Sequence, residues 1–406
     1  LNVPVDYWGA MVPAGKLTPI GRLPKTTVCD RQAVLRAAAA LIQADYPLIL
    51  AGAGIVRAEA APELKALAER LQARVATSPT AKGIFPENHE LSLGVFGFAG
   101  HERARDIILS NRVDVLIAAG VSMSETTTFN WDPAVAPRDC LIHLDINVDS
   151  IGRNYPVDVP LVGDARTVLQ ELLSCVDELL GERVAAPLWS REMPLDGSRY
   201  RRPDLRASEA LPLTPQRWRA EFNEVLPENA LVFSDVGGHM LFNVHDLEIQ
   251  EKQDFVLNLG FGSMGHGTAA PIGAALGRPD RPVFAIVGDA CFMMNGMELL
   301  TALEYDIPVI WIVENNQMHG ISWHGSQMVG TKRPMDAVVY DKPVDIGRIG
   351  KAMGLDVWVV DRPGQMGPAL EAALEAGRPA MIEVLVDPTI SPPVGDRART
   401  IGGIQQ

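Results

Sequence analysis

Two polar side chains that suit a hard metal ion follow two short apolar stretches of this 406-residue chain. Residues 283–287 (VFAIV) lead into Asp289, and residues 309–313 (VIWIV) lead to Asn316. Such runs are typical of buried parallel strands, and a helix is expected between them at residues 295–305. Parallel strands end at the same edge of their sheet, so the carboxylate and the amide oxygen converge there. With main-chain carbonyls, water and phosphate oxygens, these groups suit Mg²⁺ or Ca²⁺ better than zinc, and the pattern predicts a site for a phosphorylated partner.

The spacing of this pair resembles the thiamine diphosphate motif, a Gly-Asp pair followed by an Asn-Asn pair, with 27 positions from Asp289 to Asn316. The resemblance implies that Asp289, the Asn316 side chain and the Met318 carbonyl hold Mg²⁺ on the diphosphate of thiamine diphosphate. The third motif residue is usually glycine and is Ala290 here, which leaves the implied ligands intact. The cofactor contacts implied at this turn are Gly288, Asp289, Ala290 and Cys291. The alternative is an ordinary buried strand-helix-strand unit, in which Asp289 caps a helix and the Asn pair forms a turn.

A glycine pair follows an earlier apolar strand, in the sequence Asp-Val-Gly-Gly-His at 235–239. Glycines after a strand allow main-chain N–H groups to face an anion at the start of a helix. In the resembled family this loop touches the cofactor diphosphate, which implies contacts from Gly237, Gly238 and His239. The alternative is that His239 is a helix-end residue without a ligand.

A second glycine-rich turn, GFGSMGHG at 260–267, supports two competing interpretations. In the resembled family a similar stretch places a large apolar side chain under the cofactor and bends it, so that its amino group faces the reactive thiazolium carbon. This implies that Met264 is the wedge, with Gly262 and Ser263 beside it, whereas the alternative is a core methionine. As a dinucleotide fingerprint, the same turn indicates a nicotinamide-dependent oxidoreductase. The acid that would bind the ribose, Asp280, lies in a turn before the next strand, which disfavours that interpretation.

His319 and His324 follow the Asn pair and are candidates for proton transfer to a substrate carboxylate or enamine, because histidine titrates near neutral pH. His319 is also expected beside the cofactor. The alternative for both is a packing or surface role. Synthases of branched-chain precursors in the resembled family usually have Trp at the position of Gly325, whereas here the Trp is Trp323.

The composition describes a globular chain without a nucleic-acid or membrane partner. It is 47% hydrophobic with a formal net charge of −14 and a pI near 5.1, whereas nucleic acids and anionic membranes bind basic surfaces. No apolar run reaches the ~18 residues that cross a bilayer, and the start lacks the layout of a secretion signal. The cysteines form no CxxC pair, so neither a zinc site nor a disulfide framework is expected. We therefore expect a cytoplasmic protein with reduced thiols.

Alternating helical and strand-like patterns predict an α/β protein with two doubly wound parallel-sheet domains. The expected segments are a linker at 1–30, a central domain at 31–184, a linker at 185–213, a diphosphate-binding domain at 214–387 and a tail at 388–406, which is expected over the surface as a lid. Gly52-Ala53-Gly54 predicts a tight turn rather than a dinucleotide fingerprint, since the third glycine and the acid are missing. In acetolactate synthases the central domain binds FAD, often with an Arg soon after the glycine that matches Gly120. That Arg is missing here, which disfavours FAD or another nucleotide and leaves it as the alternative.

Together these residues resemble the central and diphosphate-binding domains of the acetolactate synthase-like branch of the thiamine diphosphate-dependent enzymes. The resemblance implies decarboxylation of a 2-oxo acid with carboligation, in a dimer or tetramer. In that branch a segment similar to LNVPVDYW closes the pyrimidine-binding domain, so we expect that domain, with its catalytic glutamate, on a partner polypeptide or in a part that was cleaved or left out. The alternatives are a simple 2-oxo acid decarboxylase or acyl-CoA lyase of the same family, a nicotinamide-dependent oxidoreductase, and a non-catalytic cofactor-binding subunit.

Overall fold

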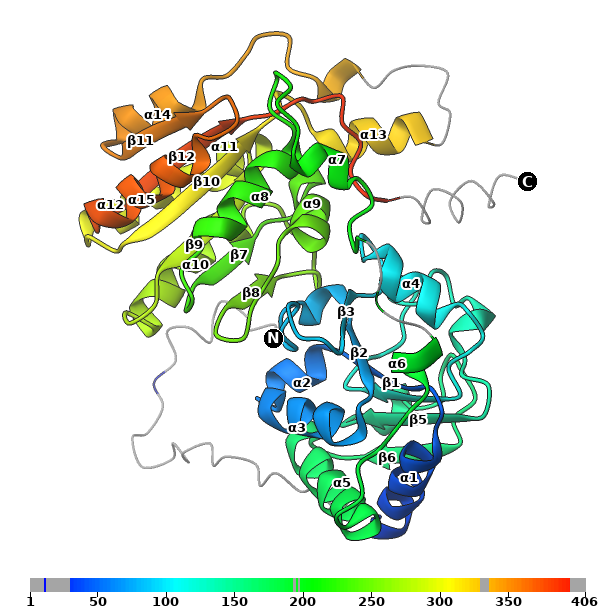
Figure 1. The fold of residues 1–406 in the computed structure, drawn as a ribbon. Coiled ribbons are helices and arrows are strands. Elements are labelled where there is room, and N and C mark those ends of the chain that lie inside the picture. Colours follow the sequence, from blue (N-terminus) through cyan, green and yellow to red (C-terminus); the bar gives the residue numbers. More distant parts are fainter. Residues whose placement is uncertain (1–10, 12–29, 193–194, 196–197, 329–335, 395–406) are drawn as a thin grey trace.

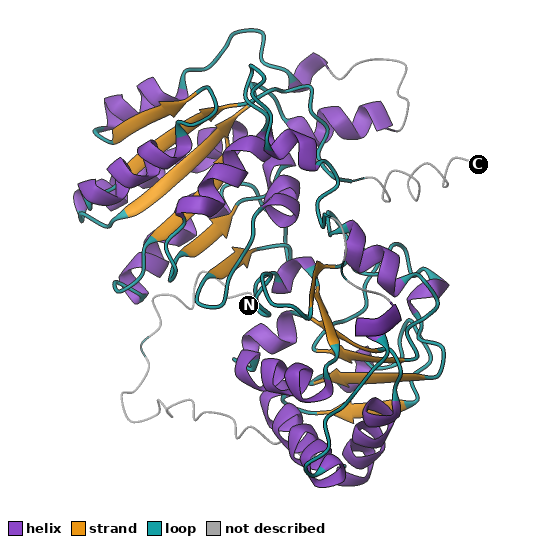
Figure 2. Cartoon of the chain, in the orientation of Figure 1, coloured by secondary structure: helices purple, strands orange, loops and turns teal. Residues whose placement is uncertain are grey.

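A computed structural model describes residues 11, 30–192, 195, 198–328 and 336–394 of the chain. These residues form two units, each built on a six-stranded parallel sheet with helices on both faces (Figure 1, Figure 2). The predicted α/β fold with two doubly wound sheets is confirmed. The expected domain and linker boundaries stay a prediction. Almost all of the expected linker at 1–30, and the tail beyond 394, lie outside the described residues.

The first sheet has the strand order β3-β2-β1-β4-β5-β6. Its strands are β1 (Pro47–Ala51), β2 (Arg74–Thr77), β3 (Ser92–Val95), β4 (Val115–Ala119), β5 (Cys140–Asp145) and β6 (Val159–Val162). Its helices are α1 (Arg31–Gln43), α2 (Ala53–Arg57), α3 (Ala61–Leu71), α4 (Glu102–Ile108) and α5 (Ala165–Leu180), with 3-10 turns η3 (Pro79–Ala81), η4 (Pro133–Val135) and η5 (Val148–Ser150). Helices α1, α3 and α5 pack on one face and α4 on the other, so β1 and β4 are buried along their whole length.

The second sheet has the strand order β11-β12-β10-β9-β7-β8. Its strands are β7 (Leu231–Ser234), β8 (Asp254–Leu257), β9 (Val283–Gly288), β10 (Val309–Asn315), β11 (Asp356–Val360) and β12 (Ala380–Leu385). Its helices are α8 (Pro215–Val225), α9 (Gly238–Asp246), α10 (His266–Gly277), α11 (Asp289–Asn295), α12 (Leu299–Glu304), α13 (Gly320–Met328), α14 (Ile346–Met353) and α15 (Met366–Ala376), with η6 (Gly296–Glu298) and η7 (Asp336–Val338). Helices α8, α9 and α15 pack on one face, and α10, α11, α12 and α14 on the other. Two single-turn helices, α6 (Trp189–Glu192) and α7 (Pro203–Arg206), lie between the sheets in sequence.

The helix expected at 295–305 is wrong in its bounds, because α11 already begins at Asp289 and η6 separates it from α12. The break falls at Asn295-Gly296, where Asn295 leaves the helical region with φ of −129°. Asn-Gly is a strong turn signal, and a Cβ on Gly296 would lie 3.0 Å from the Phe292 ring. The early start places the N-terminus of α11 directly at the tip of β9.

The two units are joined by hydrogen bonds that a buried ion pair of the first unit makes with the main chain of the second. The Lys82 and Glu87 side chains are 0% and 1% exposed and lie 2.7 Å apart. Lys82 also donates to the Leu247 carbonyl at 2.8 Å, and the Ile249 N–H donates to Glu87 at 2.8 Å. All three protons of the Lys82 ammonium therefore have acceptors: the two Glu87 oxygens in the first unit and the Leu247 carbonyl in the second.

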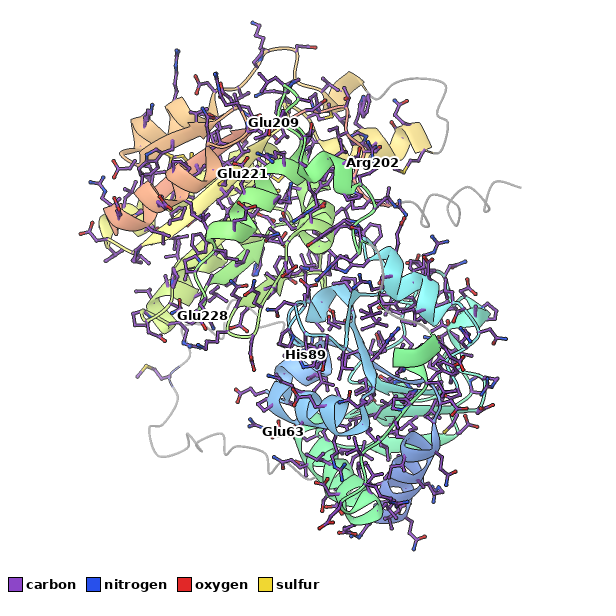
Figure 3. All side chains as sticks on the ribbon, in the orientation of Figure 1. Glu63, His89, Arg202, Glu209, Glu221 and Glu228 are labelled. Atoms are coloured by element: carbon purple, nitrogen blue, oxygen red, sulfur yellow. The ribbon has the colours of Figure 1, made fainter. Side chains whose placement is uncertain are left out.

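Acidic side chains are found both at the surface and in the interior of the described residues. Glu209 and Glu228 are 76% and 74% exposed (Figure 3). Among the described helices, none combines the length and the apolar composition that a membrane span requires.

Candidate functional site

The ends of β9 and β10 lie side by side, as predicted. The two strands pair in parallel, with Gly288 opposite Glu314. Asp289 follows in the first turn of α11 and is 2% exposed. Its carboxylate accepts a hydrogen bond from the Gln317 N–H at 2.8 Å. The first predicted metal ligand is therefore in direct contact with the loop that carries the other two.

A cavity of about 180 Å³, partly open to solvent, lies at these strand tips. It is bounded by the N-terminus of α9, which follows β7, and by that of α11, which follows β9. The strands β7 and β9 are neighbours and their helices pack on opposite faces, so the cavity occupies the crevice in which α/β sheets bind ligands. The predicted residues that line it are Gly237, Gly238, His239, Gly262, Met264, Gly288, Asp289, Ala290, Cys291, Asn316, Met318 and His319. Of the predicted site residues, Ser263 and His324 are the two that the structure leaves out of this lining.

Asn316 and Met318 belong to a tight loop after β10. Gln317 between them has φ of +60°, and Asn316 Oδ1 accepts a hydrogen bond from the Met318 N–H at 3.2 Å. Burial raises the pKa of Asp289 to about 7, and the negative charge of Glu314 acts in the same direction. Within the described residues no three His, Cys, Asp or Glu side chains gather into a metal cluster. A metal here would depend on one carboxylate, an amide, a carbonyl and oxygens of the ligand, a set that fits a hard divalent ion.

The N-terminus of α9 forms the opposite wall of the cavity. A Cβ on Gly237 would lie 2.8 Å, and one on Gly288 2.9 Å, from the His239 ring, so glycine is required at both positions. Burial lowers the pKa of His239 to about 3, and the positive charge of Arg219 acts in the same direction. The ring is therefore neutral, and its buried Nε2 has no hydrogen-bond partner. A buried, unpartnered nitrogen beside a cavity fits a site that receives a polar ligand.

The turn that carries Met264 is held by Asp235, a residue that the sequence analysis did not assign to the site. Asp235 follows β7, is 1% exposed, and accepts hydrogen bonds from the Gly265 N–H and the Thr268 hydroxyl. Gly265 has φ of +89°, a conformation that favours glycine. Met264 is half-buried, lines the cavity and packs on the core of the second unit. The sequence feature that could have identified Asp235 as a site residue is its position directly after a buried strand.

The dinucleotide interpretation of this turn gains no support from the structure. The turn follows β8, which is an edge strand and does not flank the crevice between β7 and β9. The Asp280 side chain is 67% exposed and pairs with Arg278. Asp280 therefore lies in a surface turn, as the sequence predicted, and its carboxylate does not line the cavity.

The two candidate histidines have different surroundings. His319 is half-buried, lines the cavity and packs edge-on against the Tyr340 ring, with 6.0 Å between the ring centroids. His324 is buried on α13, and its Nδ1 lies 3.1 Å from the Ser391 hydroxyl of the tail. Burial lowers the pKa of His324. The arrangement brings His319 to the cavity and makes His324 a support for the tail.

Cys291 packs in the interior beside the cavity. It is 1% exposed, and its Sγ donates a hydrogen bond to the Val236 carbonyl at 3.2 Å. Burial raises the pKa of this thiol to about 12. The thiolate that a nucleophile needs is therefore strongly disfavoured.

A buried ion pair that was not predicted joins the two walls of the cavity. Arg219 on α8 is 0% exposed and donates to Glu314 at 2.7 Å. It also donates to the His239 carbonyl at 3.0 Å and to Asn243 at 2.8 Å. Glu314 accepts a second hydrogen bond from the Trp218 indole at 2.9 Å. The sequence signal was weak: an arginine beside Trp218 on a helix that also carries Arg217 and Glu221.

The glycines after β1 form the predicted tight turn. The Gly52 N–H donates to the Ala119 carbonyl at 2.9 Å, and the Gly54 N–H donates to the Gly120 carbonyl at 2.8 Å. A Cβ on Gly52 would lie 2.3 Å from the Gly120 oxygen. Neither of these two N–H groups is free for a phosphate, so the turn lends no support to FAD or another nucleotide.

Comparison with known proteins agrees with this geometry. Residues 34–172 match the central domain of the thiamine pyrophosphate enzymes, and residues 235–384 match their C-terminal TPP-binding domain. The chain is 30% identical over 400 residues to the probable acetolactate synthase large subunit of Methanocaldococcus jannaschii, covering 96% of this chain and 65% of that protein. It is 30% identical over 375 residues to the acetolactate synthase isozyme 3 large subunit of Escherichia coli, covering 90% and 63%. It is also 30% identical over 426 residues to the sulfoacetaldehyde acetyltransferase of Alcaligenes xylosoxydans, covering 95% and 68%. The chain thus spans about two thirds of the length of these relatives.

Proposed function

We propose a function from the fact that this chain belongs to the thiamine pyrophosphate enzyme family. The chain binds the diphosphate of the cofactor and so forms one half of an active site, which decarboxylates a 2-oxo acid and joins the product to an acceptor. One observation carries the proposal. Asp289, Asn316 and Met318 come from two neighbouring strand tips and line one cavity with the N-terminus of α9. The crevice has both an oxygen-donor set for a divalent ion and a helix N-terminus for an anion.

The proposed roles follow from these positions. Asp289, the Asn316 side chain and the Met318 carbonyl hold Mg²⁺, which neutralises the cofactor diphosphate. Because His239 is neutral, positive potential at the opposite wall comes from the first main-chain N–H groups of α9, which have no partner within the helix. When bound, thiamine diphosphate would supply a thiazolium ring that accepts the electron pair left behind when a 2-oxo acid loses CO₂. Met264 supports the cofactor from its turn, and His319 at the cavity wall exchanges protons with the substrate.

A pyrimidine-binding domain that carries the catalytic glutamate is proposed to complete the site from a partner polypeptide or another protomer, in a dimer or tetramer. The surface beside the cavity supports a protein partner. Met293, Met294 and Met297 are 53%, 55% and 66% exposed on α11 and η6, next to the cavity-lining residues Asp289 to Cys291. Exposed apolar side chains gathered beside a site are typical of an interaction surface.

Calorimetry with thiamine diphosphate and Mg²⁺ tests the cofactor assignment without requiring turnover. We expect metal-dependent binding by the wild-type protein and its loss in Asp289→Ala, because the dication then lacks its only carboxylate ligand. Asp280→Ala is the matched control, since it removes an exposed carboxylate of the same unit. Equal binding by wild type and Asp289→Ala contradicts the assignment.

A second candidate is acetyl transfer, because the chain is as similar to the sulfoacetaldehyde acetyltransferase as to the synthases, at 30% identity. The simple decarboxylase and acyl-CoA lyase alternatives share the same cofactor half-site. Product analysis after reconstitution with a pyrimidine-domain partner separates them: acetolactate from a 2-oxo acid favours the synthase, and an acetylated product formed with sulfoacetaldehyde favours the transferase.

A further inference from the structure

A buried carboxylate stands behind the loop that carries the predicted metal ligands. Glu383 on β12 is 3% exposed. Its Oε1 accepts hydrogen bonds from the Asn315 side-chain amide at 2.7 Å and from the Ile346 N–H at 3.2 Å, and its Oε2 accepts one from the Gly347 N–H at 2.9 Å. A Cβ on Gly347 would lie 2.7 Å from Oε2, so glycine is needed for this approach. The carboxylate therefore connects the tip of β10 with the first turn of α14.

Asn315, the first residue of the Asn pair, transmits this contact to the loop. It is 2% exposed. Its amide nitrogen donates to Glu383 at 2.7 Å and to the Val344 carbonyl at 3.0 Å. Its Oδ1 accepts from the main-chain N–H of Gln317 at 3.2 Å and from the Gln317 side chain at 2.6 Å. A carboxylate oxygen accepts hydrogen bonds, so Glu383 fixes the orientation of the Asn315 amide, with the nitrogen toward Glu383 and the oxygen toward Gln317.

Gln317 completes the connection to the predicted ligands. Its φ of +60° is a left-handed conformation that costs free energy in a residue other than glycine. The Gln317 side chain is held on both sides by Val344, through bonds of 2.7 Å to its N–H and 2.9 Å to its carbonyl. The Gln317 N–H donates to Asp289 at 2.8 Å. A continuous chain of hydrogen bonds thus runs from Glu383 to the carboxylate of Asp289.

We propose that Glu383 is a positioning residue for the metal loop, acting through Asn315 and Gln317 on Asp289 and on the Met318 carbonyl. This role depends on the proposed function, because it concerns the ion that the loop would hold. Groups that orient metal ligands typically change metal affinity about 10-fold to 100-fold when they are removed. Mg²⁺ requires near-ideal octahedral geometry, whereas Ca²⁺ tolerates irregular ligand positions. A loosened loop therefore weakens Mg²⁺ binding more than Ca²⁺ binding.

The first test is calorimetry of thiamine diphosphate with the full chain of Glu383→Gln, once with Mg²⁺ and once with Ca²⁺. The substitution keeps the side-chain size but turns one of the two acceptor oxygens into a donor. We expect the Mg²⁺-supported Kd to rise about 10-fold and the Ca²⁺-supported Kd to rise less than about threefold. Asp345→Asn is the matched control, because Asp345 caps the same helix through the Arg348 N–H at 2.8 Å, whereas the Asn315 amide donates to Val344 and Glu383. An equal change in both Kd values, or the same change in Asp345→Asn, overturns the role.

An exchange of the two groups provides the second test. Asn315→Asp alone places two carboxylates face to face and is expected to abolish Mg²⁺-supported binding. Asn315→Asp combined with Glu383→Gln restores an amide-carboxylate pair and is expected to recover at least part of it. A double variant that binds no better than Asn315→Asp contradicts the proposal.

Hydrogen exchange of residues 315–319 in the cofactor-free protein separates this role from the proposed function. Faster exchange in Glu383→Gln than in both wild type and Asp345→Asn supports positioning of the loop. Equal exchange in all three overturns it. Absence of metal-dependent binding in wild type would refute the proposed function alone, and the exchange result would still decide the role of Glu383.

Discussion

Arg219→Met tests whether the buried Arg219-Glu314 pair joins the two walls of the cavity. Methionine retains an apolar stem of similar length against the Trp218 ring, over which the guanidinium lies at 4.2 Å. Glu314, which is 3% exposed, keeps a single hydrogen bond, from Trp218. A buried charge that loses its partner typically costs about 3–5 kcal/mol, and we expect that loss in the free energy of unfolding of the second unit.

The double variant Arg219→Met/Glu314→Gln isolates the charge from the packing. Both variants lose the bonds from Arg219 to His239 and Asn243, so their difference reports the unpaired charge of Glu314. We expect the double variant to be more stable than Arg219→Met by about 2 kcal/mol, because a neutral amide can remain bonded to Trp218 without a buried charge.

Urea unfolding followed by near-UV circular dichroism measures both values, and an unchanged m value allows the midpoints to be compared. A double variant that is no more stable than Arg219→Met would refute the assignment of a buried, mutually compensated pair. The same samples show whether cofactor binding falls in parallel, as expected if the pair aligns the N-terminus of α9 with the tip of β10.

Three further outcomes are expected. Burial raises the pKa of Asp289 to about 7 in the cofactor-free protein, so the folded state keeps a proton that the unfolded state releases. The contribution of Asp289 to stability therefore falls as pH rises from 4 toward 7, and the difference in Tm between wild type and Asp289→Asn across that range measures it. Lys82→Met leaves Glu87 buried without a cation and should cost about 3–5 kcal/mol in thermal unfolding, whereas Lys65→Met, which breaks an exposed pair at the same contact between units, should cost less than about 1 kcal/mol. Cys291, with its pKa raised to about 12, should stay unmodified by iodoacetamide at pH 7.5 in the native protein, as read by peptide mass spectrometry.

Much of the fold follows from local patterns in the sequence. The apolar runs at 47–51, 283–287 and 309–313 became buried parallel strands, and the glycine turns fell where each strand ends. The helix bounds between β9 and β10 were wrong, because α11 starts directly after the strand at Asp289 and the Asn295-Gly296 turn separates it from α12. The sequence offers both His319 and His324 for proton transfer, and the structure separates them, because His319 lines the cavity against Tyr340 and His324 contacts Ser391.

The amino-acid sequence alone determined the alternation of strands and helices, the motif spacing from Asp289 to Asn316, and hence which strand tips carry oxygen donors. The tertiary structure decided which side chains support these strand tips. Arg219 donates a hydrogen bond to Glu314, 95 residues away, and Asn315 donates one to Glu383, 68 residues away. Periodicity specifies which face of a strand is buried. Which buried polar groups meet depends on the register of β12 against β10 and on the position at which α8 packs on the sheet. A carboxylate in an apolar interior requires such partners, and they are assembled only when distant parts of the chain pack together.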